Sequence, residues 1–177
     1  ANMAAGSHFV VSGNSDVSFN RLVMASGNMD VRSGFIQSTY LSLKEAAHFK
    51  LDHQARVSMD RIDLIKGKIS HVSGNFRVKE LVLDDDGEFQ MTGGELVVDL
   101  LDKQKMKVFD WKKGRLKAKT VKGDLVNDAG VLSPGESPGT TTIEGDYTVI
   151  SADAILEMEI EGTSAGDFDK LIITGTY

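Results

Sequence analysis

The chain has 177 residues, of which 41% are hydrophobic, and it carries a formal net charge of −6 and no cysteine. This length suffices for one domain with a substantial core, whereas the lack of cysteine excludes disulfide frameworks and cysteine-bound metals. No apolar run approaches the ~20 residues that span a bilayer, the first residues lack a signal-peptide pattern, and the acidic balance speaks against a nucleic-acid-binding protein.

The predicted elements, in chain order, are short β-strands separated by glycine-containing turns. Large apolar residues alternate with polar ones in residues 8–13, 17–24, 76–83, 95–101, 155–162 and 171–177, a pattern typical of strands with one buried face. Residues 40–51, YLSLKEAAHFKL, are the best helical candidate. Their apolar residues fit the strand pattern of the rest of the chain, so we expect a turn flanked by strands there.

Similar residues recur about every 20 positions, which is the signature of a repeat architecture. Three apolar columns stand out: Phe9, Met29, Phe49, Ile69, Phe89 and Phe109; then Val11, Val31, Leu51, His71, Met91, Trp111 and Val131; then Leu41, Leu81, Leu101 and Val121, with Arg61 as an exception. Two glycine columns run between them: Gly34, Gly74, Gly94 and Gly114, and Gly27, Gly67 and Gly87. Recurrent glycines indicate repeated tight turns.

Two architectures contain many short strands, an antiparallel sandwich and a parallel solenoid. The strict period favours the solenoid, in which equivalent residues of successive turns stack ~4.8 Å apart. Hairpin signals are rare, because Asp86-Gly87 is the one Asn-Gly or Asp-Gly dipeptide in the sequence. We therefore expect an all-β chain, a β-solenoid of about eight rungs, each of about 20 residues.

The period is lost after Val131, where SPGESPG holds both prolines of the chain, Pro134 and Pro138. Proline fixes φ and glycine supplies positive φ, so two Pro-Gly units predict a stiff double corner. We treat residues 1–177 as a single solenoid domain or a piece of a longer chain. Residues 1–129 form its degenerate rungs, and residues 130–177 form the Pro-Gly corner and the C-terminal rungs.

Residues 130–177 resemble the repeats of bacterial autotransporter passengers, of the autotransporter-associated β-strand type. The residues that carry the resemblance are Gly130, Leu132, Pro134, Gly135, Ser137, Pro138, Gly139 and Thr140, followed by Tyr147, Leu156, Glu157, Gly162, Asp169 and Leu171. Residues 1–129 resemble the family only in style. The resemblance implies a right-handed parallel β-helix in an exported, surface-associated bacterial protein, and it implies no catalytic residue.

We therefore expect a non-enzymatic structural or adhesive segment, a rigid stalk or passenger that is extracellular or at the cell surface. One alternative is a β-helix that binds or degrades glycans, since polysaccharide lyases and hydrolases use this fold. Another is a filament subunit, because the open ends of a solenoid must be capped or paired, end to end or laterally. Fold alone warrants no activity.

A basic band is the strongest candidate for a binding site. Residues 103–122 hold nine Lys or Arg residues and one acidic residue, Asp110. Lys119 and Lys122 lie one period from Asp99 and Asp102, so we expect ion pairs between rungs there. Five lysines lack such an acid and are predicted to bind acidic glycans, in competition with a merely solvated face: Lys103, Lys107, Lys112, Lys113 and Lys117.

Three further constellations are weaker. Asp84, Asp85 and Asp86 offer carboxylates to Ca²⁺, although Lys66 and Lys105 lie one period away and favour ion pairs instead. The four histidines share no metal-binding spacing, and no other cofactor is indicated. A set of carboxylates and cations of the kind that polysaccharide lyases use could consist of Asp60, Arg61, Asp63 and Lys66. The spacing of these residues does not indicate a catalytic geometry.

Overall fold

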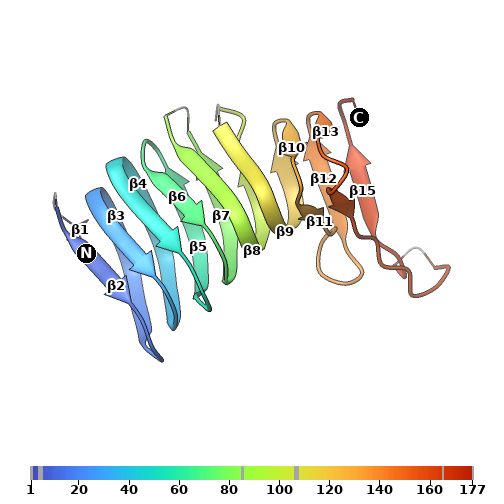
Figure 1. The fold of residues 1–177 in the computed structure, drawn as a ribbon. Helices are drawn as coiled ribbons and strands as arrows, with labels where there is room; N and C mark the ends of the chain where they lie inside the picture. The colour runs from blue at the N-terminus through green and yellow to red at the C-terminus, as the bar shows by residue number, and fades with distance from the viewer. Residues whose placement is uncertain (1, 4–5, 85, 106–107, 165, 177) are drawn as a thin grey trace.

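A computed structural model describes residues 2–3, 6–84, 86–105, 108–164 and 166–176. The chain is all-β, and its strands stack in parallel coils that form a β-solenoid of about seven turns. The fold predicted from the repeat period is thus confirmed. Figure 1 shows the coils following one another along the stack, from the N-terminus at one end to the C-terminal coils at the other.

The first coils are built from long strands that bend around corners. Their bounds are β1 (Asn2–Met3), β2 (His8–Val11), β3 (Asp16–Val31), β4 (Phe35–Leu51), β5 (Arg56–Leu64), β6 (Lys68–His71), β7 (Asn75–Leu83), β8 (Glu88–Asp102) and β9 (Val108–Lys122). Every ladder between them is parallel, and neighbours in the stack are consecutive coils. No helix in the described part of the chain is long and apolar enough to cross a bilayer.

Each coil has three straight segments that point alternate side chains inward. In β4 the inward alternation runs through Ile36 and Ser38, slips by one residue, and resumes at Leu41 and Leu43. The chain then turns near Glu45, which has a positive φ of 47°, and enters a third segment. Residues 40–51 are therefore extended rather than helical, but they belong to one strand that bends at Glu45 and not to two strands with a turn between them. The next coil buries two side chains from each segment: Val57 and Met59, Ile62 and Leu64, Ile69 and His71.

The first predicted column is confirmed along its whole length. The register pairs Phe9 with Met29, Met29 with Phe49, Phe49 with Ile69, Ile69 with Phe89, and Phe89 with Phe109. The Phe89 and Phe109 rings stack with centroids 5.0 Å apart. The side chains of this column pack in the hydrophobic core along the stack.

The second column is confirmed from Val11 to Trp111, but its predicted last member is wrong. Val131 pairs with Arg115 on a different segment. The position over Trp111 belongs to Asn127, because the backbone N–H of Asp128 donates to the Trp111 carbonyl. The coil is shorter here, so counting one full period from Trp111 overshoots the column.

The Arg61 exception in the third column has a simple cause. Leu41 pairs with Ile62 and Ile62 pairs with Leu81, so an isoleucine continues the column and Arg61 lies one place before it. One of the two coils that meet at Ile62 is longer than the average period, and the other is shorter. The average spacing stays near 20 residues, but counting exactly 20 residues from Leu41 reaches Arg61 rather than Ile62.

The final coils contain shorter strands and two loops. Their bounds are β10 (Leu125–Asn127), β11 (Val131–Leu132), β12 (Thr140–Glu144), β13 (Tyr147–Val149), β14 (Ile155–Leu156) and β15 (Lys170–Ile173). β10 pairs with β13, β11 pairs with β9 and β14, and β12 pairs with β9 and β15. The described coils thus end in a less regular part of the stack.

The SPGESPG segment lies where the preceding coils turn from the first straight segment to the second, as predicted, but it forms a loop rather than a stiff double corner. Leu132 lies over Leu116 and Thr142 lies over Thr120, so the intervening residues take the place of the end of the first segment and of this corner. The excess residues leave the ladder as a loop between β11 and β12, visible in orange in Figure 1. The next coil carries a second loop at the same place, between β14 and β15. These insertions consume chain length, which is why about seven turns form rather than the expected eight.

Replacing Phe89 by Ala should lower the free energy of unfolding by about 3–5 kcal/mol, because it removes a fully buried ring that stacks on Phe109. Chemical denaturation monitored by circular dichroism measures this. The control is Gln90→Ala, one residue along the same strand and only half-buried, which should cost about 1 kcal/mol or less. Equal costs for the two variants would contradict the stacked core.

Candidate functional site

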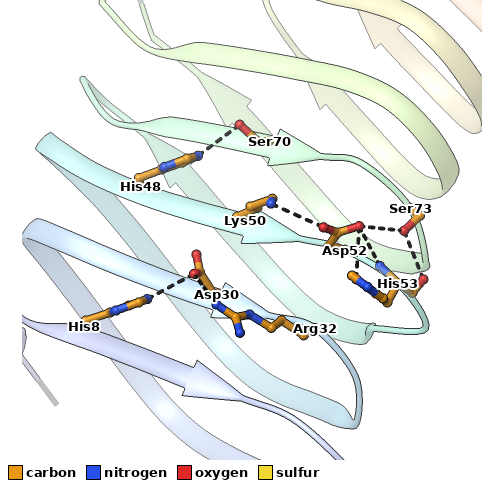
Figure 2. A network of polar contacts seen from close by, with 9 residues as sticks. All are labelled: His8, Asp30, Arg32, His48, Lys50, Asp52, His53, Ser70 and Ser73. Carbon is orange, nitrogen blue, oxygen red and sulfur yellow. Dashed lines mark hydrogen bonds and ion pairs between the residues drawn. The ribbon is translucent and has the colours of Figure 1, made fainter.

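The outer surface of the third segment and the corner after it carry a network of polar contacts, drawn in Figure 2. At its N-terminal end, His8 Nε2 lies 3.0 Å from Asp30 Oδ2, and Arg32 Nη2 lies 3.7 Å from the same oxygen. The His8–Asp30 contact joins neighbouring coils, whereas Arg32 and Asp30 belong to the same coil. The His8–Asp30 contact thus adds a side-chain link to the backbone ladder between β2 and β3.

Asp52 is the centre of the second part of the network (Figure 2). Its carboxylate accepts hydrogen bonds from the His53 backbone N–H at 2.8 Å and the Ser73 hydroxyl at 3.2 Å, and it lies 3.2 Å from Lys50 Nζ. Desolvation alone would raise the pKa of Asp52, but these hydrogen bonds outweigh it and hold the pKa below its usual value. Asp52 thereby fixes the conformation of the corner that contains His53, a non-glycine residue with φ of 53°.

His48 and Ser70 form a contact between an imidazole and a hydroxyl in this network. His48 Nε2 lies 2.9 Å from Ser70 Oγ. Burial lowers the pKa of His48, so the imidazole is neutral near pH 7 and can accept the hydroxyl proton. Within the described residues no carboxylate bonds the other ring nitrogen of His48, so the pair lacks the orienting acid of a hydrolase triad.

A hollow of about 710 Å³ adjoins this network at the corner between the third and first segments. His53 belongs both to the network and to the wall of the hollow. A second hollow of about 380 Å³ continues it along the first segment, and the two share Arg56 and Asn75. The sequence did not reveal this feature, because its residues are polar, lie at four different corners and form no motif.

The predicted lysine patch is not brought together. Lys112 lies 3.3 Å from Asp110 and 3.0 Å from Asp128 of the next coil, so the premise that it lacks an acid one coil away is wrong. Lys117 is aligned with Val97, as the premise requires, but its Nζ reaches Glu95 at 3.7 Å. Asp128 comes near because the coil that follows Trp111 is shorter than the average period, a change that counting could not show.

The other three lysines differ among themselves. Lys103 donates to the backbone carbonyl of Asp124, lies 5.9 Å from the Phe109 ring centroid, and has its pKa lowered by burial. Lys113 is exposed at a corner after the third segment. Lys107 lies outside the described residues. The described lysines therefore occupy different sides of the solenoid, and glycan binding by them stays a prediction.

Ion pairs between coils follow the predicted register. Lys119 Nζ lies 2.7 Å from Asp99 and Lys66 Nζ lies 3.5 Å from Asp86. Lys122 is aligned with Asp102 in the ladder, but the two form no ion pair in the described part of the chain. Of the weak calcium candidates, Asp84 lies 4.0 Å from Lys105 and Asp85 falls outside the described residues. Among the described residues no group of three or more potential metal ligands gathers.

The lyase-like constellation is also occupied by internal contacts. Asp60 pairs with Lys79 at 2.8 Å, and Arg61 bridges Asp63 at 2.9 Å and Glu80 at 2.6 Å. The Tyr40 hydroxyl donates to Asp63 at 2.6 Å. These contacts tie three coils together, so the residues hold the stack in register.

His71 is fully buried in the second column, as its apolar position indicated. Its Nε2 lies 3.2 Å from the Gly74 carbonyl, whereas Nδ1 has no hydrogen-bond partner within the described part of the chain. Burial lowers the pKa of His71 to about 4. The imidazole is therefore neutral near pH 7 and belongs to the core.

No protein-family model, curated protein or solved structure matches this chain. The hollow and the polar network are therefore interpreted from their own geometry.

His71 should make the folded protein sensitive to mild acid. The unfolded chain takes up a proton near pH 6.5 that the folded protein resists until about pH 4, so stability is complete above 6.5 and is lost as the pH falls between these values. The loss should reach about 3 kcal/mol. His71→Leu, which matches its neighbour Leu51, should remove that part of the pH dependence in urea denaturation measured from pH 7 to pH 4.

The Gly74 carbonyl keeps a donor in this variant, the Glu95 backbone N–H at 2.9 Å. Met91→Leu, in the same column and without a titrating group, serves as the control and should retain the wild-type pH profile. An unchanged profile in His71→Leu would show that His71 is not the source of the acid sensitivity.

Proposed function

We propose that this chain is a non-enzymatic structural segment of an exported bacterial surface protein, a rigid β-helical stalk or passenger. The observation that carries the proposal is the unbroken inward column from Phe9 to Phe109, which joins successive coils into one stack. Such a column gives a rod whose stiffness comes from packing between neighbours rather than from a single globular core.

The residues that resemble autotransporter repeats also have structural roles. A Cβ at Gly130 would overlap the Trp111 ring, and the Tyr147 hydroxyl receives a hydrogen bond from Asn127 at 3.1 Å. Asp169 accepts from the backbone N–H groups of Gly139 at 2.7 Å and Glu159 at 2.9 Å, and so holds the two inserted loops together. Motif positions that serve packing and loop closure support a structural repeat.

The export proposal is tested on intact cells of the source bacterium with an antibody raised against this chain. We expect surface labelling that disappears after brief protease treatment of the cells, because an exposed rod is accessible from outside. A cytoplasmic protein serves as the control and should resist the protease. Detection of the chain only after lysis would contradict the proposal.

A second candidate function, end-to-end self-association, is favoured by the last coils. They expose large apolar side chains, among them Ile150 (66% exposed), Ile155 (52%) and Ile160 (79%). Apolar surface at the open end of a stack favours pairing with another copy of the chain. This end lies opposite the N-terminal coil in Figure 1.

Sedimentation velocity over a range of concentrations tests this second candidate. We expect association that weakens when Ile150 and Ile160 are both replaced by Lys, because the charges would be desolvated on contact. Val10→Lys, an exposed valine at the opposite end, is the control for added charge. A concentration-independent monomer in the unmodified protein would rule the candidate out.

A further inference from the structure

The corners between the third and first segments alternate in length along the N-terminal half of the stack. Four residues separate Val11 from Asp16, three separate Val31 from Phe35, four separate Leu51 from Arg56, and three separate His71 from Asn75. The register records the same alternation, since Asp16 pairs with Phe35, Phe35 with Arg56 and Arg56 with Asn75. Because the ladders fix the strands, an extra corner residue has to project outward.

The alternation creates the hollow described above. Asn14 lies in one long corner and His53 and Gln54 lie in the other, while Ser33 and Gly34 of the short corner between them also line the hollow. Asp16, Arg56 and Asn75 begin the adjoining strands and complete the wall. The lining spans four successive corners, which corresponds to roughly 15 Å along the stack.

Among the residues that the structure describes, five of the polar side chains that line this hollow have no polar partner, whereas His53 contacts Asp52 and Ser33 accepts from the Gly13 backbone N–H. Within the described residues, the side chains of Asn14, Asp16, Gln54, Arg56 and Asn75 form no hydrogen bond and no ion pair. On the neighbouring outer surface, by contrast, Asp30, Lys50 and Asp52 are all engaged with partners. Unpaired donors and acceptors that gather around one hollow are available to a ligand.

The charge of the hollow favours an uncharged ligand. Arg56 is balanced by Asp16 on the same wall, and the remaining groups are amides, a hydroxyl and an imidazole. A polyanion would be repelled by Asp16 and would find one guanidinium, whereas the hydroxyls of a neutral ligand can donate to Asp16 and accept from Arg56 and the amides.

An aromatic surface lies where the two hollows meet. The Phe35 ring is half-buried and lines the second hollow, and Arg56 Cζ lies 5.8 Å from the ring centroid. The ring and the guanidinium offer apolar and planar surface beside the hydrogen-bonding groups. A ligand that alternates C–H faces and hydroxyl edges matches both.

We propose that this corner groove binds a neutral oligosaccharide, lying along the stack across the four corners. Asn75 and Arg56, which belong to both hollows, are its central contacts. The binding is non-covalent. This inference does not rest on the proposed surface location, since the purified chain would bind in the same way.

The test uses the purified full chain with cellohexaose, maltohexaose and chitohexaose, by isothermal titration calorimetry and ligand-observed NMR. We expect at least one of the three to bind. Arg56→Ala and Asn75→Ala should each weaken that binding at least tenfold with an unchanged melting temperature, because both side chains are exposed. Arg32→Ala removes an exposed arginine at the same edge that does not line the groove, and it should bind as the unmodified protein does.

Two further arms keep the proposal falsifiable. If Arg56→Ala fails to fold, Arg56→Gln replaces it and should show the same loss. A heparin hexasaccharide tests the basic band, with Lys112, Lys113 and Lys117 all changed to Ser. Heparin binding that depends on these lysines, without binding of any neutral sugar, would overturn the proposal. So would neutral-sugar binding that survives both Arg56→Ala and Asn75→Ala, or no binding at all.

Discussion

The parallel backbone ladder between successive coils is the constraint on which the rest of this structure depends. It holds each residue about 4.8 Å from its counterpart in the next coil, so a side chain that points inward in one coil has an inward neighbour in the next. A large apolar side chain therefore recurs at the equivalent position of successive coils, from Phe9 to Phe109. A loop cannot enter the ladder, and for this reason SPGESPG is extruded and Thr142 returns to its place over Thr120.

The same constraint determines the charged surface. Lys119 is held over Asp99 and Arg61 is held over Glu80, so these ion pairs follow from stacking and need no ligand to explain them. Exposed pairs of this kind contribute only about 0–1 kcal/mol each. They penalise a slip of register more than they add stability, since a slip would place like charges over one another.

The sequence sufficed to predict the fold because the inward columns repeat faithfully enough to be counted. Prediction from the sequence failed where the number of residues per coil changes. At Arg61 a coil longer than the average is followed by a shorter one, and at Val131 a short coil precedes an insertion. The lysine patch failed for the same reason, since Asp128 reaches Lys112 only through the shortened coil. The groove could not be predicted from the sequence. Its corners alternate between four and three residues, and this alternation does not change the average repeat length.

Corners and extruded loops are the places where the number of residues can vary without breaking the ladder. Variation in length at these places changes the shape of the surface and leaves the core columns aligned. Glu45 and His53, non-glycine residues with positive φ, both lie at corners. Among the described residues, Asn14, Asp16 and Gln54 lie around such a corner without polar partners, whereas Lys68 and Glu88 on the third segment pair across coils. A solenoid of this kind separates its two tasks in space: the straight segments maintain the stack, and the corners are free to acquire a binding surface.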